Sequence, residues 1–300
     1  MKQHTIKSEF TLRSVGLHTG LDITATFLPA PANTGVWLRR VDLPNKPCFQ
    51  ALADYVSATE RGTVLEHGRW KVSTVEHALS ALYALGVDNC IIEVNAPEMP
   101  ILDGSARFFV KEILRVGLEE QDAEQQVYIV REPIEYISEH GHIMRIEPCD
   151  HYEVDVTIAF QSNILREQHA TLRNLNDFPQ EVASARTFCF VREIEPLLRV
   201  GLIKGGDLKN ALVIYETEMS QEGMDYFCDK MGQPHMDATK LGYLSPLNYL
   251  NEPARHKLLD VIGDSALLGL RLQGRIIAYK PGHTFNTQCI RRLRNQILSE

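Results

Sequence analysis

The chain has 300 residues, 44% of them hydrophobic and 23% charged, with a formal net charge of −8. This composition is typical of a soluble globular protein, and the length suits about two domains. The acidic balance argues against a nucleic-acid partner, because no long Lys/Arg run offsets it. The one basic cluster, residues 291–294, is expected on the solvated face of a last helix.

We expect no secretory signal and no membrane-spanning stretch. The chain opens on the polar residues MKQHT, and its longest apolar stretch, residues 78–87, is far too short to span a bilayer. The six cysteines are scattered without a C-x-x-C pair, which argues against a disulfide framework and a structural zinc knuckle. We therefore expect a cytoplasmic monomer, and a transient contact with a membrane surface stays open.

The first half predicts short strands and two helices. Residues 21–27 alternate apolar and polar side chains, as a half-buried antiparallel strand does. Ser73 and Glu76 have the spacing of a capping box, which predicts a helix over 74–85. Phe108 belongs to a second, amphipathic helix. Further strands are expected over residues 36–41, 63–66, 70–72 and 89–94.

The second half predicts more strands and three helices. The charge-rich run 119–126 is the best candidate for a linker between the halves. The polar segment 218–239 favours a loop or a small excursion. Helices are expected over 192–200, 253–268 and 286–298, and strands over 127–130, 134–137, 143–146, 152–160, 211–215 and 275–279.

The two halves end alike. Each runs from a helix with a histidine near its start, His77 or His256, into a strand, a Pro/Gly loop and a closing helix. This weak repeat predicts an α+β fold of two related domains, residues 1–122 and 123–300, with the two histidines in corresponding places.

His256 and Asp260 stand four residues apart in a helical stretch and so share one face of the helix. A neutral imidazole and a carboxylate can bind one metal ion, although an ordinary polar helix edge is the commoner explanation of a lone H-x-x-x-D pair. His77 would add a third ligand and leave an open position for water, as a catalytic zinc requires. Glu76 projects about 100° round the helix from His77 and could take a proton from that water. The same ligand set also suits Fe(II).

Several motifs occur together and in chain order. They are VGLHTG (15–20), STVEH (73–77), EVNAPE (93–98), PILDGS (100–105), ARTF (185–188), RHKLLDVIGD (255–264) and KPGH (280–283). This ordered set resembles the UDP-3-O-acyl-N-acetylglucosamine deacetylases, zinc enzymes at the committed step of lipid A synthesis in Gram-negative bacteria. The resemblance implies hydrolysis of the N-acetyl group of UDP-3-O-[(R)-3-hydroxyacyl]-N-acetylglucosamine, with release of acetate and the free amine.

The resemblance also implies roles for the residues of the centre. His77, His256 and Asp260 match the family's zinc ligands, and Glu76 matches the general base that activates water. Thr187 would by default be an ordinary strand threonine. It matches the residue whose hydroxyl holds the tetrahedral oxyanion, through a hydrogen bond that strengthens as charge develops.

The remaining matches concern the acid and the substrate. His283 matches the group that protonates the departing amine, and Asp264 matches the carboxylate that orients and charges it. Lys257 matches a lysine of the active centre that contacts the substrate. Lys280 is expected to pair with the diphosphate, and His18 matches a histidine near the sugar. Without the resemblance, Asp264 could equally be a surface carboxylate and Lys280 an exposed strand end.

The family's fold implies two domains, each layering a small, mainly antiparallel sheet with two helices, and an active site between them. Each domain would carry an insert, a small β insert near 35–72 and a β-α-β insert near 188–215. The second insert would form a hydrophobic passage for the acyl chain, although its apolar residues could equally form its own core. The residues expected to line the passage are Phe188, Phe190, Ile194, Leu198, Ile203, Ala211 and Val213.

One segment departs from the better-known pattern of the family. Residues 59–63, TERGT, stand where enterobacterial members carry Met, Leu and Cys, which changes the local acyl contacts. Two other functions stay open: a zinc deacetylase acting on another N-acyl amino sugar, and a non-catalytic binder of nucleotide sugars or acyl chains. The binder would need a missing base or ligand, whereas the base, the acid and all three ligands are present.

Overall fold

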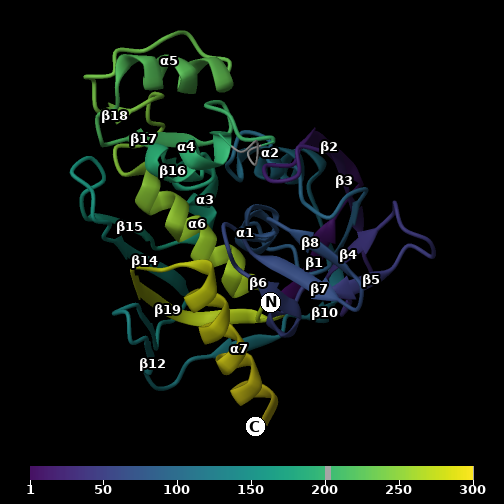
Figure 1. Cartoon of the computed structure of the whole chain (residues 1–300). Helices are drawn as coiled ribbons and strands as arrows, with labels where there is room; N and C mark the ends of the chain where they lie inside the picture. Colours follow the sequence, from purple (N-terminus) through teal and green to yellow (C-terminus); the bar gives the residue numbers. More distant parts are fainter. Residues whose placement is uncertain (200–203, 300) are drawn as a thin grey trace.

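A five-stranded sheet forms the framework of the first half of the chain (Figure 1). The structure, a computed structural model, describes residues 1–199 and 204–299. In spatial order the strands are β2 (Phe10–Val15), β3 (Asp22–Pro29), β9 (Cys90–Val94), β4 (Val36–Arg40) and β5 (Cys48–Gln50). Only β4 and β9 run parallel. The alternation predicted for 21–27 is confirmed, because every second residue of β3, from Ile23 to Phe27, is buried.

A second sheet, of six strands, forms the framework of the second half. Its order is β12 (Ile134–Ile137), β13 (Ile143–Glu147), β19 (Arg271–Tyr279), β14 (Tyr152–Ile158) and β15 (Gln168–Leu172), with β11 (Val127–Ile129) beside β19. The central strand β19 pairs parallel with β14 and β11 and antiparallel with β13. The expected α+β class with mainly antiparallel sheets is therefore confirmed.

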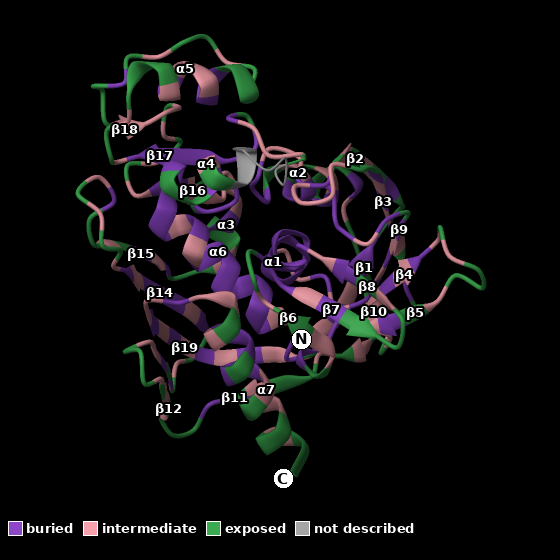
Figure 2. Cartoon of the chain, viewed as in Figure 1, coloured by how far each residue is buried: buried purple, intermediate pink, exposed green. Residues whose placement is uncertain are grey.

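The two halves meet through a pair of helices. These are α1 (Glu76–Ala84), in the first half of the chain, and α6 (Glu252–Ala266), which precedes β19 in the second half. They pack so closely that a Cβ at Gly263 of α6 would lie 2.2 Å from the backbone oxygen of Glu76. Every residue of α1 is buried (Figure 2). One apolar core continues through both halves and includes Leu82 and Ile262 of this helix pair.

Two further helices pack against the pair formed by α1 and α6. α2 (Arg107–Val116) packs on α1 and β2, and α7 (His283–Ser299) packs on α6. Short helical turns lie at η1 (Ala53–Tyr55), η2 (Leu175–Asp177) and α3 (Phe178–Glu181). No helix of the described part of the chain is long and apolar enough to pass through a bilayer.

Two small three-stranded sheets stand apart from the main ones. The first is β6 (Val56–Ala58), β7 (Val64–His67) and β8 (Trp70–Ser73). It takes up only the last part of the insert expected at 35–72, because β4 and β5 belong to the main sheet. The second joins β16 (Phe188–Phe190), β17 (Leu212–Tyr215) and β18 (Gly242–Tyr243). The parallel pair β16 and β17 with α4 (Val191–Arg199) between them forms the β-α-β unit near 188–215.

Two polar segments, the predicted linker and the predicted loop or small excursion, contain regular structure. The run 119–126 lies mostly within β10 (Leu118–Glu124), which pairs with β1 (Lys2–Ile6), and Lys2 forms ion pairs with Asp122 and Glu124. The segment 218–239 contains α5 (Gln221–Lys230), which buries Met224 and Phe227 in a second apolar cluster with β17. The division of the chain into 1–122 and 123–300 stays a prediction.

The capping box predicted at the start of α1 is wrong. Ser73 ends β8, where its backbone pairs with residues 97 and 99, Thr74 has a positive φ of 59°, and α1 begins only at Glu76. The carboxylate of Glu76 accepts a hydrogen bond from the backbone N–H of Thr63 instead.

Candidate metal centre and active site

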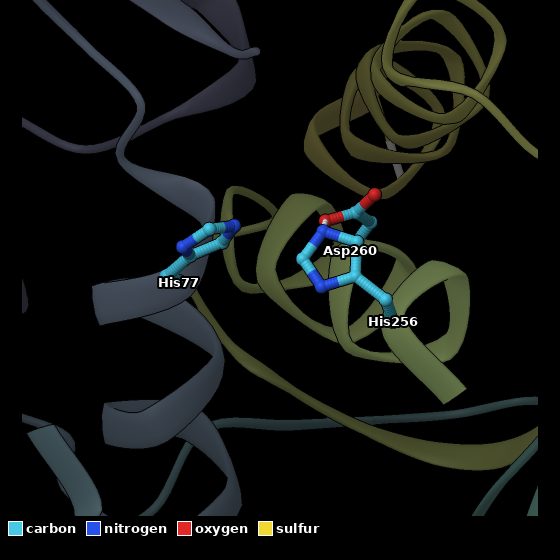
Figure 3. A group of neighbouring side chains, drawn as sticks. All are labelled: His77, His256 and Asp260. Carbon is cyan, nitrogen blue, oxygen red and sulfur yellow. Dashed lines mark ion pairs between the residues drawn. The ribbon is translucent and has the colours of Figure 1, made fainter. Parts of the chain in front are cut away.

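Helices α1 and α6 bring His77, His256 and Asp260 together (Figure 3). His77 is the second residue of α1, while His256 and Asp260 follow each other by one turn on α6. One potential ligand atom from each residue lies within 4.8 Å of those of the other two. The two imidazole rings stand nearly perpendicular, at 87°, with centroids 5.1 Å apart. The group predicted from the i, i+4 spacing and the second helix thus converges in space.

The two histidines bring ring nitrogens to this point. Burial, assisted by His256, lowers the pKa of His77 to about 3, and burial also lowers the pKa of His256. Both rings are therefore neutral near pH 7. Nδ1 of His256 donates a hydrogen bond to the backbone oxygen of Ala185 (3.0 Å), which leaves its Nε2 facing Asp260 at 3.4 Å. This is the outer support that metal-binding histidines usually have.

Asp260 supplies the negative charge of the group. Burial alone would raise the pKa of its carboxyl, but Lys257, His256 and His283 outweigh burial and lower the pKa. Its Oδ2 accepts a hydrogen bond from Nζ of Lys257 (2.9 Å), whereas its Oδ1 is buried without a hydrogen-bond donor. A buried carboxylate oxygen without a donor, beside two neutral imidazoles, fits a bound cation.

The carboxyl of Glu76 and the imidazole of His283 lie close together next to this group. Burial raises the pKa of Glu76 to about 7, with Asp260 and Asp264 adding to the rise and His283 opposing it. Burial works against the charge of His283, but the three carboxylates, Asp264 first, raise its pKa to about 10. Nε2 of His283 lies 3.6 Å from Oε1 of Glu76, and its Nδ1 donates to Oδ2 of Asp264 (3.0 Å). A buried carboxyl and a protonated imidazole thus lie beside each other at this place.

A cavity of about 210 Å³ opens onto these groups. Glu76, His256, Asp260 and His283 line its polar end. Its remaining lining residues are Leu17, His18, Arg61, Thr187, Phe188, Cys189, Glu193, Ile194, Gly206, Asp207, Ala211, Val213, Met231 and Lys257. One end of the cavity therefore carries carboxyl and imidazole groups, and its wall is rich in apolar side chains from the β-α-β unit and its surroundings.

Most of the predicted substrate contacts border the cavity. His18, Thr187, Lys257, Phe188, Ile194, Ala211 and Val213 do so, and Asp264 lies behind His283. Phe190 does not: it is buried in the main core, where it packs against Phe160 with ring centroids 5.7 Å apart. Lys280 is not part of the lining either, and its Nζ lies over the ring of Tyr279. Ile203 lies outside the described residues.

Two polar residues near the site were not predicted. Thr63 contacts Glu76, Asp264 and His283, which are 13, 201 and 220 residues away in the chain. Such distances leave no local pattern in the sequence. Glu98 is fully buried and its carboxylate accepts hydrogen bonds from the backbone of His18 (2.9 Å) and from the hydroxyl of a neighbouring threonine. An acidic residue within a Pro-rich motif was the one available signal for this anchor of the His18 loop.

A buried carboxyl, a protonated imidazole and three potential metal ligands close to one cavity are typical of the class of metal-dependent hydrolases. The family model described as LpxC, UDP-3-O-acyl N-acetylglycosamine deacetylase, matches residues 3–230 and 236–295. The chain belongs to this family, which confirms the resemblance drawn from the ordered motifs.

Individual relatives agree with this assignment. The chain is 55% identical to a protein of Bacteroides thetaiotaomicron and 52% identical to one of Porphyromonas gingivalis, each named bifunctional enzyme LpxC/FabZ. Both matches cover 99% of this chain, which spans 65% of the length of each relative. A protein of Bdellovibrio bacteriovorus named UDP-3-O-acyl-N-acetylglucosamine deacetylase is 36% identical over 97% of this chain and 89% of its own length.

Proposed function

We propose that this protein hydrolyses the N-acetyl group of UDP-3-O-[(R)-3-hydroxyacyl]-N-acetylglucosamine, releasing acetate and the free amine. This would be the committed step of lipid A biosynthesis, performed by a cytoplasmic monomer. Membership of the family supports the reaction. The observation that carries the proposal for this chain is the convergence of the His77, His256 and Asp260 group with Glu76 and His283 at one end of a partly apolar cavity.

We infer that His77, His256 and Asp260 hold a zinc ion. Two neutral imidazoles and one carboxylate are ligands that zinc accepts, and three protein ligands leave a position open. A zinc ion bound there would supply Lewis acidity to a carbonyl oxygen and acidity to a water molecule. Fe(II) has the same ligand preferences, so the test below includes it.

Glu76 is the proposed general base. Its carboxylate takes a proton from the water that attacks the acetamide carbonyl, and a pKa of about 7 suits proton transfer near neutral pH. Thr187 lies in the cavity wall, where its hydroxyl would donate to the oxyanion that develops on the former carbonyl oxygen. Lys257 adds a partly buried positive charge at the same end, next to Asp260.

His283 is the proposed general acid. The carboxylate of Asp264 raises the pKa of His283 and so keeps the ring protonated. The ring then gives its Nε2 proton to the nitrogen that leaves as the free amine. Because Nε2 lies 3.6 Å from Oε1 of Glu76, acid and base can serve the same carbon atom without a movement of either helix.

The apolar wall of the cavity suits the acyl chain of the substrate. Phe188, Ile194, Ala211 and Val213 lie along it, so we propose that these side chains contact the fatty acid. We place the sugar near His18. A contact between Lys280 and the diphosphate stays a prediction, since this side chain does not line the cavity.

The decisive experiment measures acetate release from this substrate by the purified protein. Activity should vanish after chelation and return with zinc, with Fe(II) tested in parallel. A His77→Ala variant, given the same excess of zinc, serves as the inactive control. Absence of release by fully metallated protein would refute the substrate assignment, and other N-acetylated nucleotide sugars would then be tested for the same reaction.

A further inference from the structure

The 59–63 loop, residues 59–63 between β6 and β7, belongs to the first half of the chain and contacts helices of the second half. At its start, the hydroxyls of Thr59 and Thr284 lie 2.7 Å apart, which joins the loop to the first turn of α7. At its end, Thr63 is completely buried between α1, α6 and α7. The proposed reaction uses none of these residues.

Thr63 contacts the base and the acid at once. Its backbone N–H donates to Oε2 of Glu76 (3.0 Å), and its hydroxyl donates to Oδ1 of Asp264 (2.7 Å). Nδ1 of His283 lies 3.1 Å from the same hydroxyl oxygen and 3.0 Å from Oδ2 of Asp264, so its proton is shared between the two acceptors. Thr63, Asp264 and His283 thus form a closed hydrogen-bonded ring.

The backbone of the loop is shaped for this contact. Arg61 has a φ of 62° and Gly62 a φ of 147°, conformations that L side chains rarely adopt. A Cβ at Gly62 would lie only 3.0 Å from Oε1 of Glu76, so the glycine lets the chain pass close to the base. The turn therefore delivers the N–H of Thr63 to the carboxylate of Glu76.

We propose that Thr63 is a positioning residue that holds the base Glu76 and the acid His283 in one fixed geometry. This inference rests on the proposed function, since it assigns a task to Thr63 in the same reaction. Among the described residues, the hydroxyl of Thr63 is the one hydrogen-bond donor to Oδ1 of Asp264. Without it the carboxylate is held through Oδ2 alone, by Nδ1 of His283 (3.0 Å) and Nδ2 of Asn286 (2.9 Å). The plane of the carboxylate, and with it the ring of His283, is then less firmly oriented.

Two substitutions separate the hydroxyl from the shape of the side chain. Thr63→Val keeps the branched shape and the backbone N–H but removes the hydroxyl, whereas Thr63→Ser keeps the hydroxyl. Thr5→Val is the matched control, because Thr5 is also buried and its hydroxyl also makes two hydrogen bonds, to Asn89 (2.7 Å) and from Ala30 (3.0 Å). Thr5 lies in β1, outside the proposed site.

The expected result is a loss of kcat without a matching change in KM or metal content. Thr63→Val should lower kcat about 10–100-fold, the usual effect of removing a residue that orients an active-site group. Thr63→Ser should restore most of that loss, and Thr5→Val should keep the kcat of the unmodified protein. Wild-type kcat in Thr63→Val, or equal losses in the valine and serine variants, would overturn the proposal. So would a fall in bound metal that accounts for the lost activity.

A measurement without substrate separates this inference from the proposed reaction. The Nδ1–H proton of His283, held between two oxygen acceptors, should give a slowly exchanging imidazole NMR signal in the unmodified protein and in Thr63→Ser. The signal should be lost or strongly broadened in Thr63→Val. If the protein is inactive on the proposed substrate but shows this pattern, the reaction fails and the positioning role stands. An unchanged signal in Thr63→Val would overturn the positioning role whatever the activity.

Discussion

A single methyl group at Gly263 should separate the two helices that carry the candidate metal ligands. In Gly263→Ala the new Cβ would lie 2.2 Å from the backbone oxygen of Glu76, whereas ordinary van der Waals contact begins at 3.4 Å. Because the obstructing atoms are backbone, no side chain can turn aside, and α1 and α6 must move apart by roughly 1 Å. His77 travels with one helix and His256 with the other.

Two opposing effects set the size of the change in stability. Alanine is favoured over glycine in a helix by about 1 kcal/mol. Overpacking of a close contact typically costs about 1–3 kcal/mol, and a clash with backbone belongs at the upper end. We therefore expect a net loss of about 1–2 kcal/mol in the free energy of unfolding. The metal centre should suffer more, because a shift of roughly 1 Å between ligands can cost about 100-fold in function.

The assay compares Tm, bound zinc and acetate release in Gly263→Ala and Gly223→Ala. Gly223 is the control, since it also lies in a helix, α5, but a Cβ there would come no closer than 3.3 Å to another atom. Gly223→Ala should leave all three quantities near those of the unmodified protein. If Gly263→Ala also keeps its Tm and its zinc affinity, the argument from close helix packing is refuted.

Three further substitutions test individual groups. Glu76→Gln should retain bound zinc but lose activity by orders of magnitude, because the base acts in catalysis alone; full activity would remove Glu76 from the mechanism. Asp260→Ala should lower zinc affinity, and an unchanged metal content by elemental analysis would place the third ligand elsewhere. Arg186→Met should lower the free energy of unfolding by about 3–5 kcal/mol, because it leaves the buried carboxylate of Glu252 without its ion pair. A urea titration that shows less than about 1 kcal/mol would contradict this account.

The parts of the structure set by local pattern were predictable. The alternation of β3 and the helix carrying His256 and Asp260 follow from side-chain periodicity, which each segment displays on its own. The same i, i+4 spacing identified two of the candidate metal ligands. His77 required more, because its place beside α6 depends on the packing of two helices that are far apart in the chain.

The errors arose where distant segments compete with local preference. The polar run 119–126 looks like a linker because nothing within it favours a buried strand, yet β1 supplies its hydrogen bonds and Lys2 its counter-charge. At the start of α1, Ser73 could cap the helix by its spacing from Glu76. Its backbone is instead paired with residues 97 and 99, and the helix begins later. In both places a partner remote in sequence decides the conformation.

The same reasoning explains why sequence patterns indicate candidate metal ligands and proton-transfer groups more readily than the residues that position them. The side chains of histidine, aspartate and glutamate can transfer protons and bind metal ions. A regular spacing between such residues therefore already indicates a possible site. Thr63 carries no such signal, because a threonine hydroxyl can serve in almost any turn or strand. Its contacts to Glu76, Asp264 and His283 exist only once three helices and a strained turn have come together. Residues that position catalytic groups should therefore be sought where one buried hydroxyl or amide joins elements from different halves of a fold.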